Sequence, residues 1–308
     1  MPWLQLIRWQ NLLIIFLTQF LAWWCVVLPE SPKILTPLNF CCLTLSTMLI
    51  AAAGYIINDY FDIKIDSINK PHKVVLEKAI PRKQAIIAHA VLNIVALAFA
   101  GYVAAQAHHY EWLLLQALCI LLLWFYSTDL KRQYIIGNLA VALLTSFTIL
   151  VLFIYEPVMQ QEAQMPLIPL SPGNNTSSLP VWVLAVYAYF AFMLTWMREI
   201  VKDMEDLKGD EAEGCVTMPV KRGLEYATRF TMGISLLAII PLLVAAITLF
   251  KHDHLLLSSY LLILLVVPLV IWSVFMSKGT TEQHYHKAST RLKLIMILGI
   301  CSLLIYHF

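Results

Sequence analysis

The sequence has few charged residues. Asp, Glu, Lys and Arg make up 13% of its 308 residues, and 60% of the residues are hydrophobic. Soluble domains carry about 25% charged residues, so this composition excludes a soluble globular domain. The mean hydropathy of +0.75 indicates a membrane protein.

The cysteines and histidines lack the spacing of a disulfide framework or a zinc site. Of six cysteines, Cys215 lies alone in a polar loop and the others lie inside apolar segments. No histidine is spaced from a cysteine in the way that zinc ligands are. We therefore expect cysteines that pack as small apolar side chains, and no zinc.

Long apolar runs, in contrast, are abundant. A membrane-spanning helix needs about 20 mainly apolar residues, and nine runs are of about this length. The sequence therefore predicts an all-α membrane protein, a bundle of nine transmembrane helices that forms a single domain over residues 1–308. The predicted spans are 11–29, 37–57, 85–106, 110–127, 135–155, 181–201, 228–250, 255–276 and 290–307.

Positive charge is distributed unevenly between the two sides of the predicted bundle. With nine spans, the N-terminus and every second loop share one side, which collects all of the 21 Lys and Arg residues except Lys33 and Lys251. Because loops rich in Lys and Arg stay in the cytoplasm, the N-terminus is predicted to be cytoplasmic. Two long cytoplasmic loops, 58–84 and 198–227, are expected to cap the bundle.

The first of these loops opens with an acidic cluster, NDYFDIKID at 58–66, directly after an apolar run. Asn58, Asp62 and Asp66 are spaced by four residues, which places them on one face of an α-helix. Carboxylates are disfavoured at the C-terminus of a helix, where the helix dipole is negative. The cluster therefore predicts a compensating cation.

A second acidic cluster, REIVKDMEDLKGD at 198–210, ends the sixth predicted span. On a helix, Asp203, Asp206 and Asp210 form one stripe on the same side of the membrane as the first cluster. Oxygen ligands suit Mg²⁺, which takes one or two carboxylates together with phosphate oxygens of a substrate. Alternatively, both clusters are solvated loop starts neutralised by nearby lysines, but two matched clusters favour a metal.

Basic residues beside both clusters are candidates for binding a diphosphate. Most basic residues on this side are expected to serve as membrane anchors, so those that adjoin a polar motif at a helix end are preferred. The basic residues predicted to bind the diphosphate are Lys73, Lys131, Arg198 and Lys202. The carboxylates predicted to hold the metal are Asp62, Asp66, Asp203, Asp206 and Asp210.

These motifs resemble those of the UbiA superfamily of intramembrane prenyltransferases. NDYFDIKID followed by NKPHK resembles the first Asp-rich motif of the family, KDMEDLKGD resembles the second, and the segment 126–138 resembles the connection between helices 4 and 5. The resemblance implies a helical bundle with a central cavity and two Mg²⁺ ions, and it leaves open whether Asp203 or Asp206 leads the second motif. It places Asn58, Asp62, Asp66, Asp203, Asp206 and Asp210 at metal positions of the family, and Asn58 also at a diphosphate position. The residues to which it gives a catalytic role are Asp62, Asp66, Asp203, Asp206 and Lys131.

The expected reaction is transfer of an isoprenyl group from a prenyl diphosphate to a hydrophobic acceptor, with release of diphosphate. The second motif resembles most the branches that act on lipid alcohols such as geranylgeranylglyceryl phosphate. An aromatic acceptor, either a quinone precursor or a chlorophyll-type substrate, is the alternative. Cavity aromatics are expected to stabilise the developing allylic cation, and Tyr55, Tyr126 and Trp196 are candidates, although packing in the bundle is the commoner role of such residues.

A cation-coupled transporter would also place carboxylates along an ion path. Such a protein should carry further charged residues near the middle of the membrane, and the predicted spans are depleted of them. We therefore favour an enzyme whose active site faces the cytoplasmic side of a bacterial or archaeal inner membrane. No nucleic-acid partner is expected.

Overall fold

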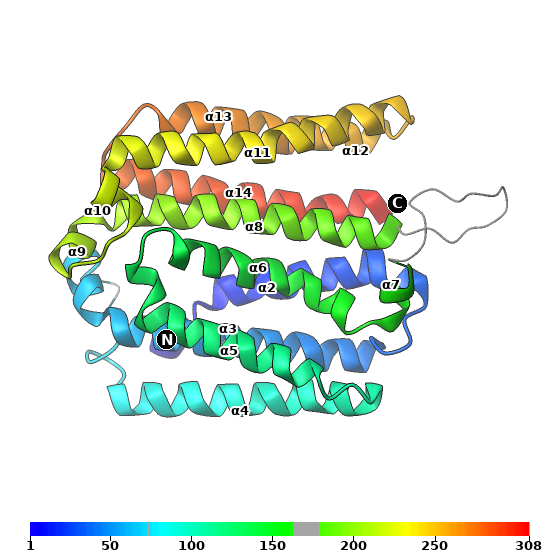
Figure 1. The fold of residues 1–308 in the computed structure, drawn as a ribbon, viewed down its shortest axis with the longest axis horizontal. Coiled ribbons are helices and arrows are strands. Elements are labelled where there is room, and N and C mark those ends of the chain that lie inside the picture. Colours follow the sequence, from blue (N-terminus) through cyan, green and yellow to red (C-terminus); the bar gives the residue numbers. More distant parts are fainter. Residues whose placement is uncertain (73, 163–178, 308) are drawn as a thin grey trace. The chain divides into compact units, whose positions relative to one another are not determined.

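The computed structural model describes residues 1–72, 74–162 and 179–307. The regular structure in these ranges is helical (Figure 1), and their extended structure is limited to an isolated bridge between Leu76 and Ile80. Lys73, a predicted diphosphate ligand, lies outside the described residues.

Eight described helices are long and apolar enough to cross a membrane, which confirms the predicted class of all-α membrane protein. The remaining predicted span, 110–127, coincides with α5 (Trp112–Thr128), a shorter apolar helix of 17 residues. The eight long segments are Trp9–Glu30 (α2, η1 and η2), Pro37–Asn69 (α3), Arg82–Ala107 (α4), Ile136–Ile154 (α6), Pro180–Glu205 in α8 (Leu179–Glu205), Leu224–Lys251 (α11), Leu255–Met276 (α12, η4 and α13) and Glu282–His307 (α14).

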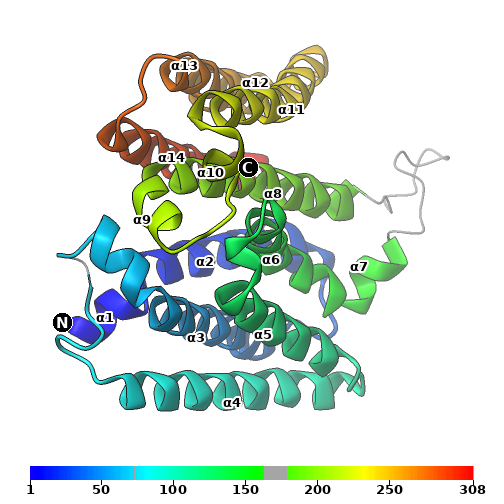
Figure 2. The ribbon, with the colours of Figure 1, turned by 60° about the vertical axis from the view of Figure 1, so that its left-hand side comes forward.

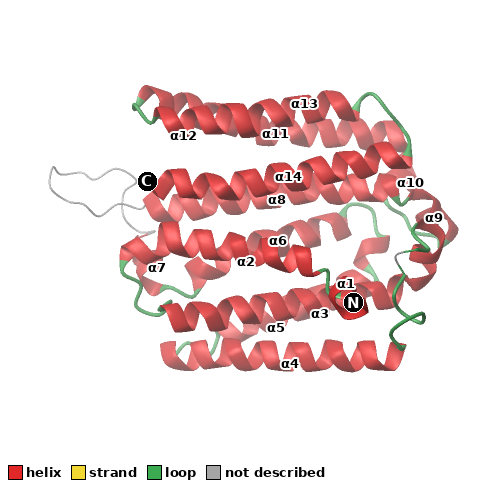
Figure 3. Ribbon diagram, turned by 180° about the vertical axis from the view of Figure 1, so that it is seen from behind, coloured by secondary structure: helices red, strands yellow, loops and turns green. Residues whose placement is uncertain are grey.

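One short helix precedes the long ones, and the other short helices lie between them along the chain (Figures 2 and 3). Several begin at or next to a proline, whose fixed φ suits the first turn of a helix. The short helices are α1 (Pro2–Leu6), η3 (Leu130–Arg132), α7 (Pro157–Glu162), α9 (Leu207–Ala212) and α10 (Met218–Arg222).

The chain divides into two compact units. Unit 1 comprises Met1–Thr128 with Ser146–Ala188, and unit 2 comprises Asp129–Thr145 with Tyr189–Phe308. The first acidic cluster belongs to unit 1 and the second to unit 2, so the surroundings of each cluster are given within its own unit.

In unit 1, α3 packs closely against α4 and α5 just before the first acidic cluster. The sequence AAAG at 51–54 supplies small side chains, and a Cβ added to Gly54 would lie 2.9 Å from Cδ1 of Leu123 in α5. Small residues let membrane helices approach each other closely. This stretch therefore sets the close spacing of α3 and α5.

A buried carboxylate holds the far end of α3. Glu156, which follows α6, is fully buried and accepts hydrogen bonds from the backbone N–H groups of Lys33, Ile34 and Leu35 at 3.1, 3.0 and 2.9 Å. Charge-assisted bonds of this kind are strong and satisfy buried backbone donors. They tie the segment that precedes α3 to the end of α6.

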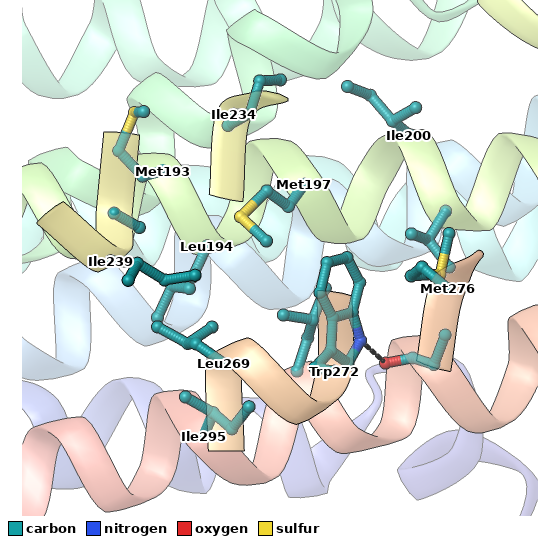
Figure 4. Close-up of a cluster of buried hydrophobic side chains, with 14 of the residues drawn as sticks. Met193, Leu194, Met197, Ile200, Ile234, Ile239, Leu269, Trp272, Met276 and Ile295 are labelled. Carbon is teal, nitrogen blue, oxygen red and sulfur yellow. Dashed lines mark hydrogen bonds between the residues drawn. The ribbon is translucent and has the colours of Figure 1, made fainter. Parts of the chain in front are cut away.

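The core of unit 2 contains side chains of α8, α11, α13 and α14, together with residues of η4 and α10. Figure 4 shows Met197 of α8 in the same cluster as Trp272 of α13, whose Nε1 donates to the backbone oxygen of Ala288 in α14 at 2.9 Å. A buried indole N–H needs such a partner. The cluster holds the helix that carries the second acidic cluster.

Candidate active site

The first acidic cluster lies on the last turns of α3. The helix continues to Asn69, so the segment predicted as the loop 58–84 begins with about three further turns of helix. Nδ2 of Asn58 donates to Oδ2 of Asp62 at 2.8 Å, as the four-residue spacing predicts. Asp62 is 7% exposed, and Asp66 is half-buried one turn further on.

Arg8 is a neighbour of this cluster that no pattern in the sequence predicted. It lies between α1 and α2 in the left-handed conformation, with a φ of 51°, and its Nη2 lies 2.7 Å from Oδ1 of Asp59. The guanidinium carbon is 5.0 Å from the ring centroid of Tyr55, within the range of a cation–π contact. The charge of Asp66 also acts on Arg8. In the sequence, Arg8 is one basic residue before an apolar run and looks like a membrane anchor.

The chain after α3 folds back over the helix end. Leu76 and Ile80 pack with Leu6 and Ile63 in a buried apolar cluster. Such contacts exclude water from one side of the helix. The segment that follows the first acidic cluster is therefore held against α1 and α3 within unit 1.

The second acidic cluster does not lie on one continuous helix, which corrects the predicted stripe. α8 ends at Glu205, α9 begins at Leu207, and Asp206 between them has φ −95° and ψ 9°. The spacing rule for a single helix therefore holds only as far as Asp206, because the backbone departs from α-helical geometry there. Asp203 and Asp206 are half-buried, and Asp210 is buried.

Two neutral side chains donate to the second acidic cluster. Nδ2 of Asn138, from α6, donates to Oδ2 of Asp203 at 2.9 Å, and Oγ1 of Thr217 donates to Oδ2 of Asp210 at 3.2 Å. Asn138 belongs to the family-like segment 126–138, but no pattern in the sequence predicted a role for it. In the sequence, Asn138 is a single polar residue at the start of an apolar run. It pairs with Asp203 as Asn58 pairs with Asp62.

A glycine brings η3 close to the start of α6. A Cβ added to Gly137 would lie 2.6 Å from Cα of Lys131 and 2.7 Å from the backbone oxygen of Leu130, closer than real Cβ contacts allow. The backbone N–H of Val216 donates to the oxygen of Arg132 at 2.8 Å. These contacts hold Lys131 beside the segment that follows α9.

Electrostatics around Cys215 show that the charged groups of unit 2 converge. Burial, followed by the negative charge of Asp210, raises the pKa of the Cys215 thiol above its ordinary value. Arg132 and Lys131 oppose this rise, and Asp203 adds to it. Because such effects fade with distance, Lys131 and both carboxylates lie near this thiol.

The predicted cations Arg198 and Lys202 share a buried carboxylate. Nζ of Lys202 lies 2.9 Å from Oε2 of Glu199, whereas Nη1 of Arg198 lies 3.4 Å from Oε1. Nε of Arg198 is buried and has no hydrogen-bond partner among the described residues. Arg198 is therefore less completely satisfied than Lys202.

The three candidate cavity aromatics have different surroundings. Tyr55 lies beneath Arg8, and Tyr126 is half-buried near the end of α5. Trp196 packs between Phe192 and Phe230, with centroid distances of 5.9 and 5.8 Å. Contact with a substrate stays a prediction for all three.

The donor atoms of both clusters fit Mg²⁺. Within the part of the chain that the structure describes, no group of three or more His, Cys, Asp and Glu side chains is placed to hold an ion. Mg²⁺ needs no such cage, because it usually binds one or two carboxylates and completes its shell with water and phosphate oxygens. Carboxylate and amide oxygens at the helix ends match that preference.

Comparison with known sequences identifies a family. The profile of the UbiA prenyltransferase family matches residues 12–297. A digeranylgeranylglyceryl phosphate synthase of Methanosphaera stadtmanae is 25% identical over 305 residues, which cover 98% of this chain and 97% of that protein.

Solved structures have the same fold. A structure of a digeranylgeranylglyceryl phosphate synthase matches with a TM-score of 0.63 at 23% identity, over 99% of this chain and 97% of the other. A UbiA homologue from Archaeoglobus fulgidus bound to GPP and Mg²⁺ matches with a TM-score of 0.59 at 15% identity, over 98% of this chain and 99% of the other.

Proposed function

Because the chain belongs to the UbiA prenyltransferase family and is a prenyltransferase, we propose that it transfers an isoprenyl group from a prenyl diphosphate to a lipid alcohol in the presence of Mg²⁺. The observation that carries the proposal is that both acidic clusters present an aspartate paired with an asparagine. Asn58 donates to Asp62, and Asn138 donates to Asp203. Each amide orients its carboxylate and leaves the second oxygen of that group to be used for a metal.

We propose that each acidic cluster binds Mg²⁺. The metal ligands are those predicted from the sequence, with Asn138 and Thr217 orienting Asp203 and Asp210. Lys131, Arg198 and Lys202 contribute positive charge to the phosphate oxygens. When bound, Mg²⁺ neutralises negative charge on the diphosphate as it leaves.

The proposed reaction cleaves the allylic carbon–oxygen bond of the prenyl diphosphate. The allylic carbon loses diphosphate, the hydroxyl oxygen of the acceptor bonds to that carbon, and the hydroxyl proton is released. Cations beside the leaving group stabilise the charge that develops on it. The apolar helices exclude water, which would otherwise capture the allylic carbon. They also accommodate the prenyl chain at about 0.8 kcal/mol per buried CH₂ group.

The acceptor that we propose is a lipid-type alcohol such as geranylgeranylglyceryl phosphate. The support is the similarity over nearly the whole chain to a protein named digeranylgeranylglyceryl phosphate synthase. We further propose nine transmembrane helices, with α5 as the shortest, and an active site on the cytoplasmic side. The unequal distribution of Lys and Arg supports this orientation.

The test uses purified protein with geranylgeranyl diphosphate, geranylgeranylglyceryl phosphate and Mg²⁺. Replacing one charged ligand should lower kcat/KM by roughly 10²–10³-fold or more, because stabilisation of the leaving group is lost. The variants are Asp62→Asn and Asp203→Asn, which keep the size of the side chain. Product formation is followed by mass spectrometry.

Glu211→Gln is the matched control, because Glu211 is an exposed carboxylate of α9 outside the metal ligands. It should retain wild-type activity. Wild-type rates in both aspartate variants would contradict the proposed site. Transfer to a hydroxybenzoate or dihydroxynaphthoate instead of the lipid would contradict the acceptor while leaving prenyl transfer in place.

A further inference from the structure

Two exposed cations of unit 2 lie over tyrosine rings. The short helix α10 ends with Lys221 and Arg222, and both side chains are exposed. Nζ of Lys221 lies 5.2 Å from the ring centroid of Tyr134, and the guanidinium carbon of Arg222 lies 5.8 Å from the ring centroid of Tyr226. Both distances fall within the range of about 6 Å for a cation–π contact. The rings therefore hold both cations at defined positions on the surface.

The two cation–ring pairs lie together. The backbone N–H of Val216 donates to the oxygen of Arg132 at 2.8 Å, which joins the segment before Tyr134 to the segment before α10. Burial, followed by hydrogen bonding with Tyr226, raises the pKa of the Tyr134 hydroxyl above its ordinary value, and the charge of Arg222 opposes this rise. The basic–aromatic cluster consists of Tyr134, Lys221, Arg222 and Tyr226.

The protein supplies no counter-ion to these two cations. Among the described residues, neither Lys221 nor Arg222 forms an ion pair with a carboxylate. Glu225, the acidic residue closest to them along the chain, pairs with Arg229 one turn further along α11. Two neighbouring positive charges repel each other, so an anion from the surroundings would stabilise the cluster.

The cluster lies at the ends of two membrane-spanning helices. Tyr226 is in the first turn of α11 and is 43% exposed, and Tyr134 comes two residues before α6. Exposed apolar side chains accompany them along the chain, at Ile136 and Val216. Tyrosine is enriched at the level of the lipid headgroups. The anions at this level of a membrane are the headgroups of acidic lipids, whose charge is complementary to that of the cluster.

We propose that the basic–aromatic cluster binds the headgroup of an anionic phospholipid of the surrounding membrane. The guanidinium of Arg222 can donate to two phosphate oxygens at once, and the ammonium of Lys221 adds a second positive charge. Because the tyrosine rings already restrict both side chains, less conformational entropy is lost on binding. The site uses none of the proposed metal or diphosphate ligands, and its lipid is not consumed by the proposed reaction.

A binding experiment tests the site. The full chain is purified in a neutral detergent, and the affinities for phosphatidylglycerol and phosphatidylcholine are measured by native mass spectrometry. The double variant Lys221→Met/Arg222→Met should bind phosphatidylglycerol roughly 30-fold more weakly, because each basic residue near an anionic headgroup contributes about fivefold. Its affinity for phosphatidylcholine, which carries no net charge, should not change.

A second double variant is the matched control. Lys278→Met/Lys287→Met also removes two exposed lysines of unit 2 on the same predicted side of the membrane. It should bind phosphatidylglycerol as the wild type does. The exchange Lys221→Arg/Arg222→Lys keeps both charges and should retain most of the affinity. Tyr226→Leu keeps the charges but removes one ring, and it should weaken binding several-fold. Thermal unfolding shows that each variant is folded.

Three results would overturn the site. One is an unchanged affinity for phosphatidylglycerol in Lys221→Met/Arg222→Met, and another is an equal loss in Lys278→Met/Lys287→Met. The third is a raised KM for geranylgeranyl diphosphate in Lys221→Met/Arg222→Met when no phospholipid is added, because the two cations would then serve the substrate. If the wild type prenylates no acceptor but the difference in lipid affinity is seen, the proposed reaction fails and the lipid site stands.

Discussion

Individual side chains in both units show why some site residues were visible in the sequence and others were not. Asn58 and Asp62 are one helical turn apart, so their spacing alone predicted the contact that joins them. Arg8 and Asn138 reach their carboxylates across 51 and 65 residues of chain. Local periodicity carries no information about such contacts, because they depend on how the helices pack.

Arg8→Met tests whether Arg8 positions the first acidic cluster. The substitution leaves Asp59 without its ion pair and Tyr55 without its cation–π contact. Because both charged side chains are partly exposed, the loss of stability should be modest, about 1 kcal/mol. We expect KM for the prenyl diphosphate to rise several-fold, with partial recovery in Arg8→Lys, which keeps the charge but loses the planar stacking group.

Arg82→Met is the control for Arg8. Arg82 makes an ion pair with Glu77 at 2.6 Å and lies 5.9 Å from the ring centroid of Tyr60, but about half of its side chain is exposed. This variant should retain the wild-type KM. An equal rise of KM in Arg8→Met and Arg82→Met would mean that binding of the prenyl diphosphate depends on the total positive charge and not on the position of Arg8.

The helices that carry the two acidic clusters show where helical periodicity predicts the position of side chains correctly and where it does not. α3 continues through the first acidic cluster, so the predicted face is present, whereas α8 stops before Asp206 and the second stripe is broken. The i, i+3, i+7 spacing of Asp203, Asp206 and Asp210 places them on one face only if the helix is continuous. The spacing itself therefore cannot reveal that the helix ends before Asp206. The break is visible in the backbone angles of Asp206.

Gly137→Ala tests the contact between η3 and α6. An alanine inside a helix normally gains about 0.5–1 kcal/mol over glycine. Here its Cβ meets the backbone of Lys131 and Leu130, which cannot rotate away as a side chain can. We expect a net loss of roughly 1–3 kcal/mol in the free energy of unfolding. Activity should also fall, because Lys131 and Asn138 shift.

Gly233→Ala supplies the comparison within α11. Nothing lies within 4 Å of a Cβ added there. This variant should be as stable as the wild type or slightly more stable, which thermal unfolding in detergent measures. Equal behaviour of the two alanine variants would show that η3 has room to move.

At the scale of the whole molecule, we expect the proposed prenyl donor to stabilise the folded protein only when the metal is present. Geranylgeranyl diphosphate at about 100 times its Kd should add roughly 2.7 kcal/mol to the stability of the folded state. EDTA should abolish this gain, and Mg²⁺ in excess should restore it, because the carboxylates repel the diphosphate when no cation is bound. Thermal unfolding measures the effect. An identical shift with and without EDTA would contradict metal-dependent binding.

The amino-acid sequence was sufficient for the membrane class, the family and the acidic clusters, because apolar length, composition and spacing along one helix are local properties of a chain. Packing within each unit supplied contacts between segments that are distant in the sequence: Arg8 beside Asp59, and Asn138 beside Asp203. These neighbours come from distant segments, and the burial of helix faces selects them. For that reason no local pattern could have revealed them.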